Sequence, residues 1–199
     1  MVRPPETEVH SLKAIAREMS EIGDESGYLV GVATDQHRSF RRTRRPASAL
    51  ERELFLDAAR RAASREGFAI EEVSGGVDLI ASGGGHLRKY RVKRGTRTAD
   101  GAYRFVCGLG SSLLTTEVDA LFVEERWLLG YISSEDHTLD EIIAAEVVGS
   151  EGNGPVTLLL GAVIPLIDMT PPPNFTSTEE GLDGFDDEEG TEDGSAGVA

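Results

Sequence analysis

The chain has 199 residues, a formal net charge of −15 at pH 7, and one cysteine, Cys107. This length suits one domain with appendages, and no apolar run approaches the roughly 20 residues of a membrane span, so we expect no membrane partner. One cysteine excludes an internal disulfide and a thiolate metal cluster, and the N-terminus lacks a signal pattern, which predicts a cytoplasmic protein.

Charge is divided unevenly along the chain. Residues 1–126 hold all 20 Lys and Arg together with 19 Asp and Glu, whereas residues 127–199 hold 16 acids and no Lys or Arg. Two segments are strongly basic, HRSFRRTRRP at 37–46 and HLRKYRVKRGTR at 86–97. A basic front with an acidic back suits contact with nucleic acid at one surface. A solvated charged surface and a salt-adapted acidic protein are the alternatives.

The N-terminal third predicts a helix, a strand and a basic loop. Apolar residues recur at helical spacing over 9–22, and GYLVGVATD at 27–35 has the composition of a strand. The loop that follows carries RRTRR and is closed by Pro46. Its guanidinium groups can contact phosphates whatever the base sequence, so we predict DNA contacts from four of them. These are Arg41, Arg42, Arg44 and Arg45.

The segment SALERELFLDAARRAASREG at 48–67 predicts a second helix. Ser48 and Glu51 have the spacing of a capping box, and Gly67 marks the stop. Glu51 falls on the apolar face of this helix, where a carboxylate requires a reason. The capping box is one reason, and a site over the end of a sheet is the other; the two do not exclude each other.

Beyond residue 67 the pattern changes to short strands. They are expected at 68–74, 77–82, 86–95, 103–109 and 118–133, with a hairpin turn at Asp100–Gly101. TLDEIIAAEVVG at 138–149 predicts a third helix, capped by Thr138 and Glu141, and 154–166 a closing buried strand. This order indicates an α+β or three-layer domain around one mixed sheet.

The tail from about residue 170 is rich in Pro, Gly and acids and poor in large apolar residues, so it is expected to be disordered. Its acids either keep the protein soluble, screen the basic surface or mimic DNA. The predicted organisation is an N-terminal helix, strand and basic loop over 1–45, a main domain over 46–170, and the tail over 171–199.

A helix with Glu51, a strand, GGVDL with Asp78, a turn, and a strand with Arg91-x-Lys93 follow one another in this chain. This order resembles the catalytic core of the PD-(D/E)XK nuclease superfamily, over roughly residues 48–140. The first half is similar to archaeal Holliday-junction resolvases, and the continuation to group I intron homing endonucleases. The resemblance implies a three-layer α/β/α, restriction-endonuclease-like fold, DNA as substrate, Mg²⁺ or Mn²⁺ as cofactor, and a homodimer.

By this resemblance, Asp78 is the central metal ligand and Glu51 holds the metal or a water beside it. Lys93 orients the attacking water or stabilises the phosphorane. Phosphodiester hydrolysis needs such a cation, because it lowers the pKa of water and bears charge on the phosphate. The alternative to these catalytic roles is structural: Asp78 would be an aspartate of a turn beside Gly76, and Lys93 a lysine on the face of a sheet.

Position 91 departs from the family, which has Glu or Gln there, whereas this chain has Arg. A guanidinium cannot ligate a metal, so one expected ligand is missing. A carboxylate from elsewhere, Glu71, Glu72 or Asp119, would replace the missing ligand. Arg91 would otherwise pair with Asp78 and leave a metal-free phosphate site, or turn outward and leave Asp78 a weak site.

Three functions of different class therefore remain open. The first is a metal-dependent DNA endonuclease, with Asp78, Lys93 and Glu51 as its catalytic residues. The second is an inactive nuclease-fold protein that binds DNA, with Arg91 among its contacts, or a protein partner. The third is an acidic interaction protein whose basic loop is incidental.

Overall fold

The computed structural model describes residues 3–74, 76–108, 111, 113–114, 123–153 and 155–167. The chain divides into two units, Met1–Met169 and Thr170–Ala199; the second lies outside the described residues, and so does the tail for which disorder is expected. Helices of the described part are α1 (Glu6–Ser26), α2 (Tyr28–Asp35) and α3 (Arg45–Arg65). Its strands are β1 (Ala69–Val73), β2 (Gly76–Gly83), β3 (His86–Arg94), β4 (Thr96–Arg97), β5 (Tyr103–Arg104), β6 (Val106–Cys107), β7 (Val123–Ser133), β8 (Leu139–Glu151) and β9 (Val156–Pro165).

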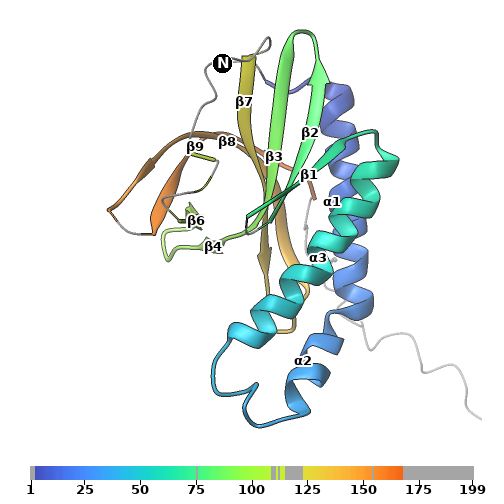
Figure 1. Ribbon diagram of the computed structural model, residues 1–199, viewed down its shortest axis with the longest axis vertical. Helices are drawn as coiled ribbons and strands as arrows, with labels where there is room; N and C mark the ends of the chain where they lie inside the picture. Colours follow the sequence, from blue (N-terminus) through green and yellow to red (C-terminus); the bar gives the residue numbers. More distant parts are fainter. Residues whose placement is uncertain are drawn as a thin grey trace, which may run out of the picture. The chain divides into compact units, whose positions relative to one another are not determined.

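The main sheet is mixed and curled. Its strand order is β1-β2-β3-β7-β8-β9-β6, and the pair β3–β7 is parallel whereas the others are antiparallel. The register of β8 with β9 shifts on either side of Val147, and such bulges bend a strand and increase its twist. Figure 1 shows the result: β8 and β9 sweep away from the flatter half formed by β1, β2 and β3.

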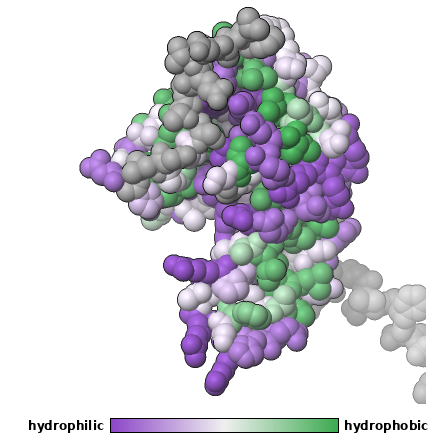
Figure 2. Space-filling model, in the orientation of Figure 1, coloured by the Kyte–Doolittle hydropathy of each residue, from purple (hydrophilic) through white to green (hydrophobic). Residues whose placement is uncertain are grey.

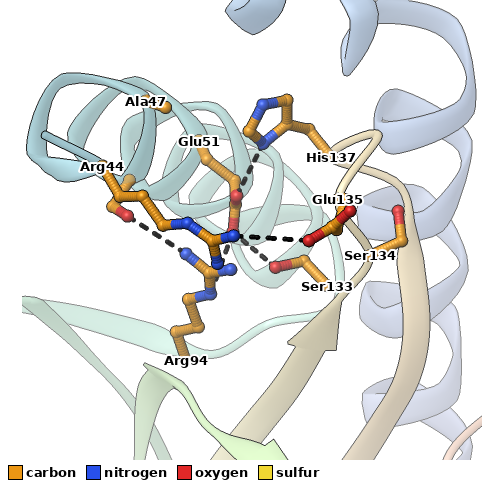
Figure 3. Close-up of a pocket in the computed structure, with 9 residues that line it drawn as sticks. Arg44, Ala47, Glu51, Arg94, Ser133, Ser134, Glu135 and His137 are labelled. Carbon is orange, nitrogen blue, oxygen red and sulfur yellow. Dashed lines mark hydrogen bonds and ion pairs between the residues drawn. The ribbon is translucent and has the colours of Figure 1, made fainter. Parts of the chain in front are cut away.

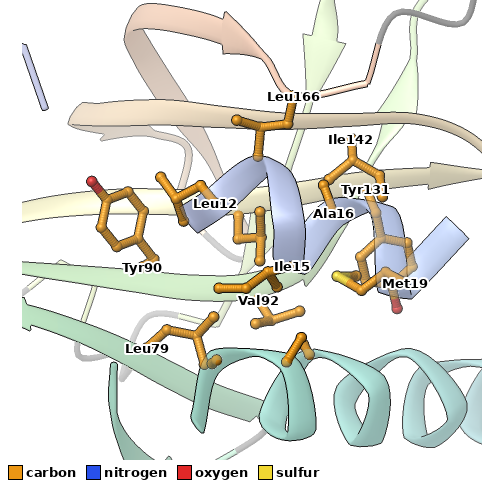
Figure 4. Close-up of a cluster of buried hydrophobic side chains, with 14 of the residues drawn as sticks. Leu12, Ile15, Ala16, Met19, Leu79, Tyr90, Val92, Tyr131, Ile142 and Leu166 are labelled. Atoms are coloured by element: carbon orange, nitrogen blue, oxygen red, sulfur yellow. The ribbon is translucent and has the colours of Figure 1, made fainter. Parts of the chain in front are cut away.

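Helices α1 and α3 cover one face of this sheet and form the main core with it (Figures 1 and 4). In β2 and β3 the residues that point toward the helices alternate with those that point away. The side chains drawn together in Figure 4 include Leu12, Ile15, Ala16, Met19, Leu79, Tyr90, Val92, Tyr131, Ile142 and Leu166. Because α1 contributes to this core, the boundary expected near residue 45 does not separate it from the main domain.

The other face carries a second core, built by strands and loops. Phe105 lies over two glycines, Gly95 between β3 and β4 and Gly130 in β7, where an added Cβ atom would come within 2.5 Å and 2.4 Å of its ring, respectively. Buried Cys107 belongs to this cluster, as a small hydrophobe. The described helices thus lie on one side of an α+β fold, and the described residues place no helical layer on the second side.

Two predicted elements are wrong. Residues 28–35 form helix α2, because α1 continues through Gly27, which keeps right-handed helical angles (φ −56°, ψ −39°). Residues 139–151 form strand β8 between β7 and β9, so Thr138 and Glu141 cap no helix. The backbone N–H and C=O groups of β8 form hydrogen bonds with its two long neighbours, β7 and β9. This pairing between strands overrides the local pattern that predicts a capped helix.

The strand expected at 103–109 is divided into β5, which pairs with β4 in a separate two-stranded sheet, and β6, which pairs with β9 in the main sheet; residue 109 lies outside the described residues. The other elements are confirmed where the structure describes them. Helix α1 contains the predicted 9–22, and α3 starts at Arg45, before the expected first residue. Strands β1, β2, β3 and β9 match their patterns, and β7 begins at Val123; residues 118–122 of its predicted strand lie outside the described residues. The hairpin joins β4 to β5, with Gly101 at a φ of +82°.

Candidate functional site

Asp78 and Arg91 form a closed ion pair inside the protein. They stand directly opposite each other on the antiparallel strands β2 and β3. Arg91 Nη2 donates to Asp78 Oδ2 at 2.9 Å, and Nε donates to Oδ1, so the contact is bidentate. Only 4% of Asp78 and 5% of Arg91 is exposed. Of the three arrangements open for Arg91, the structure has the pairing with Asp78.

Lys93 lies two residues further along β3, on the same face of the sheet as Arg91. This is the face opposite α1 and α3, because the alternate residue Val92 packs into the helix-side core. Burial, with the charge of Arg91 and Arg52 beside it, lowers the pKa of the Lys93 ammonium. Asp78 and Lys93 are therefore neighbours, but the position between them is taken by Arg91.

Glu51 lies on the helix side of the sheet, away from Asp78 and Lys93. Its side chain is 1% exposed. The hydroxyl of Ser133 donates to Oε1 at 2.7 Å, the ring Nδ1 of His137 lies 2.8 Å from Oε2, and Arg94 Nε lies 3.3 Å from Oε1. The sheet thus separates Glu51 from Asp78 and Lys93, the two residues with which the nuclease resemblance would bring it together.

These positions do not fit a magnesium ion. Both oxygens of Asp78 accept hydrogen bonds from Arg91, and Glu51 is turned toward Ser133 and His137. Of the expected substitutes, Glu71 lies 3.7 Å from Lys89 and Glu72 accepts from Arg60 at 2.8 Å; Asp119 lies outside the described residues. Nowhere in the described ranges do three His, Cys, Asp or Glu side chains gather in a way that could hold a metal.

The Glu51 cluster forms the wall of a pocket of about 340 Å³ (Figure 3). It opens where the start of α3 meets the turn between β7 and β8. His137 holds the left-handed backbone there, with a φ of 62°, in a turn closed by a hydrogen bond from Ser134 N to Thr138 O. The Glu51 carboxylate faces Nδ1 of His137, and this contact orients the ring at the pocket.

Sequence reasoning missed His137 and Ser133. Their sequence, YISSEDHT, sits where a strand was expected to lead into a capped helix. The signal was the carboxylate on the apolar face of α3, since a buried Glu requires partners. Ser48 does not cap α3: it lies within the helix, and its hydroxyl accepts from Arg94 at 3.2 Å.

The second basic segment, 86–97, is largely occupied by internal ion pairs. Arg88 is 2% exposed and contacts Glu125 at 2.7 Å and Glu8 at 3.3 Å, which ties α1 to the sheet. Arg97 donates through Nη2 to Glu141 at 2.6 Å. The positive charges of segment 86–97 therefore serve mainly to stabilise the fold and form little exposed cationic surface.

The first basic segment, 37–46, is exposed along the loop between α2 and α3. Arg41 pairs with Asp35 at 2.9 Å and Arg44 with Glu135 at 3.3 Å, and all four side chains are at least 60% exposed. For Arg38, Arg42 and Arg45 the described residues provide no ion-pair partner. Exposed pairs of this kind contribute about 0–1 kcal/mol, so they exchange easily for a ligand.

Apolar side chains are also exposed on α2 and in the loop that follows it. Tyr28 is 63% exposed and Phe40 is 45% exposed, and the ring of His37 meets Phe40 edge-on with centroids 6.0 Å apart. Leu29 and Val32 are also about half exposed. In Figure 2 the lower end of the molecule, where Figure 1 places α2 and its loop, combines a green apolar area with projecting purple side chains.

A scan against protein-family models finds no match, and searches of curated proteins and of solved structures find none either. None of the helices in the described ranges is both long and apolar enough to cross a membrane.

Proposed function

We propose that this protein binds DNA through the phosphate backbone, at a cationic surface formed by the α2–α3 loop and the start of α3, and that it does not cleave DNA with a metal ion. The observation that carries the proposal is the contrast between the two basic segments. Arg41, Arg42, Arg44 and Arg45 are exposed, while Arg91 is locked onto Asp78 in the interior. A protein that binds DNA at its surface needs exposed arginines of this kind. A metal-dependent nuclease needs an Asp78 carboxylate that is free to ligate the metal.

The beginning of α3 adds to this surface. The helix has 21 residues, no acidic residue in its first turn and no side-chain cap at Arg44. Its N-terminal end therefore carries an uncompensated partial positive charge. Arg52 and Arg94 lie beside it and are 49% and 38% exposed, which extends the cationic area beyond the loop.

The aromatic neighbours favour single-stranded DNA over duplex. Phe40 exposes its ring within the arginine loop and Tyr28 exposes its ring at the start of α2, and base stacking on such rings contributes roughly 1–3 kcal/mol per base. Bases in a duplex are already stacked on each other and cannot use these rings. We therefore expect tighter binding to a single strand, and a loss of that preference in Phe40→Ala.

The test is DNA binding by fluorescence anisotropy at several salt concentrations. Replacing Arg41, Arg42, Arg44 and Arg45 together with Ala should weaken binding to all sequences. The slope of log K against log salt should fall by up to about 3, because each lost phosphate contact on a single strand contributes about 0.7. The control replaces Arg61 and Arg65, exposed arginines at the other end of α3, and should bind like the parent.

Two outcomes would contradict the proposal. An unchanged salt slope in the quadruple variant would place DNA elsewhere on the protein. Nicking of plasmid DNA by the parent with Mg²⁺, abolished both by EDTA and by Asp78→Asn, would favour the metal-dependent endonuclease that the sequence resembles.

A further inference from the structure

A second pocket, of about 500 Å³, opens beside the first and shares Arg44, Ser48 and Arg94 with it. Its volume falls in the roughly 300–1,000 Å³ range of small-ligand sites. Among the described residues its lining holds no Asp or Glu, in contrast to the Glu51 pocket. These lining residues are Arg44, Arg45, Ser48, Ala49, Arg52, Arg94 and Tyr131.

The Tyr131 hydroxyl has no hydrogen-bond partner among the described residues. Tyr131 is 1% exposed, and its ring is fixed edge-on against Phe55 with centroids 5.2 Å apart. Burial, with the charge of Glu51 nearby, raises the pKa of this hydroxyl, so it keeps its proton at neutral pH and remains a donor. A buried donor without an acceptor is rare in proteins and requires an explanation.

The arrangement fits an acceptor with several negatively charged oxygens. Four guanidinium groups and the N-terminal end of α3 supply positive charge, although three of the four also contact a carboxylate: Arg44 that of Glu135, Arg52 that of Glu53 and Arg94 that of Glu51. Tyr131, which lines the same pocket, adds a neutral donor whose hydroxyl is buried. A phosphodiester inside a strand has one charge. A phosphate monoester has a charge of about −1.5 to −2 at pH 7 and three strong acceptor oxygens, which matches this number of donors better.

We propose that this pocket binds the terminal phosphate of a DNA strand whose following nucleotides lie along the arginines of the α2–α3 loop. The inference rests on the proposed DNA binding and adds a preferred end to it. Glu51 does not oppose the phosphate strongly, because Ser133, His137 and Arg94 already contact its carboxylate.

The test compares single-stranded oligonucleotides of one sequence that end in a 5′-phosphate, a 3′-phosphate or hydroxyls only. The parent should bind one phosphorylated form roughly tenfold more tightly than the hydroxyl form, the effect of about one charge-assisted hydrogen bond. Inorganic phosphate should reduce the tighter binding to the level of the hydroxyl form, whereas sodium chloride of equal ionic strength should not remove the preference.

Tyr131→Phe provides the decisive variant, because it removes only the hydroxyl. It should lose most of the preference for the phosphorylated end, while its melting temperature stays equal to the parent's or rises, since an unpaired buried donor is gone. Tyr90→Phe is the matched control. Its hydroxyl donates to Glu8, so the change should lower the melting temperature and leave the preference intact. If Tyr131→Phe fails to fold, Arg52→Gln, at an exposed position of the same pocket, should reduce the preference instead.

The outcomes separate the two proposals. Equal binding of all three oligonucleotides by the parent, or an unchanged preference in both Tyr131→Phe and Arg52→Gln, overturns the terminal-phosphate pocket and leaves the proposed DNA binding standing. Failure of the parent to bind any of the three overturns both.

Discussion

Two arginine-rich regions of this chain have similar sequences but different environments in the structure. Arg91 and Arg88 in β3 are buried against carboxylates, whereas Arg42 and Arg45 in the α2–α3 loop are exposed. The first pair of residues stabilises the fold, and the second is available to a ligand. The difference teaches that a basic segment predicts phosphate binding only after its charges have been matched with the acids that the fold brings next to them.

Breaking the buried pair should have the largest effect. Arg91→Met leaves the Asp78 carboxylate buried without a partner, which should lower the free energy of unfolding by about 3–5 kcal/mol. Urea unfolding followed by circular dichroism measures it. The double variant Asp78→Leu with Arg91→Met should recover most of the loss, because it removes both charges and fills the space with apolar groups.

The same pair also bears on the nuclease resemblance. Arg91→Glu restores the (Glu)-x-Lys pattern of that family but places two carboxylates opposite each other in the interior. We expect it to destabilise the protein at least as much as Arg91→Met. A folded Arg91→Glu variant that binds Mn²⁺ in calorimetry and cleaves DNA would show that the pair can open into a metal site.

Removing the acidic tail should have a moderate effect on the exposed region. Deletion of residues 170–199 removes nine acids and no Lys or Arg, so the formal net charge changes from −15 to −6. Less long-range repulsion should speed the association with DNA a few-fold at low salt, and about 0.15 M salt, with its Debye length of about 8 Å, should suppress the gain. Stopped-flow association rates at two ionic strengths measure it. A gain that persists at high salt would point to direct competition by the tail.

Lys93 should give the smallest effect, and its sign depends on pH. The folded-state pKa of Lys93 lies below the ordinary lysine value of 10.5, because burial disfavours the ammonium. Between the two pKa values the unfolded chain binds more protons, so the free energy of unfolding rises with pH there. Lys93→Met should therefore stabilise the protein by roughly 1 kcal/mol at pH 7, with the gain fading as pH approaches 10.5. Thermal melts of Lys93→Met and the parent at pH 7 and at pH 10.5 check this. A lower melting temperature of the variant at pH 7 would show that the ammonium has a stabilising partner.

The local signals predicted most of the regular elements. The short apolar run at 77–82, the glycine-rich turn after it and the strand pattern at 86–95 predicted β2 and β3, and helical spacing predicted α1 and α3. The failures at 28–35 and 138–149 have one physical origin. Both are apolar and rich in β-branched residues, so their local preference is weak, and the neighbouring element decides: α1 continues into α2, and β8 lies between two strands.

The candidate site was predicted less well, because sites depend on which face of the sheet each residue occupies. The sequence indicated correctly that position 91 and Lys93 share a face, and that buried Glu51 needed an explanation. It could not show that Glu51 lies on the opposite face, since that depends on where α3 packs. It also could not supply His137, which is 86 residues away from Glu51.

The sequence by itself determined the types of element along most of the chain and the existence of an exposed arginine loop next to Pro46. Periodicity and composition are local properties, and they are sufficient for these. Only the tertiary structure decided that Arg91 closes on Asp78 and that Tyr131 lines one pocket with four arginines, its hydroxyl without a hydrogen-bond partner among the described residues. Such pairings join residues from different elements, and the packing of helix on sheet sets them.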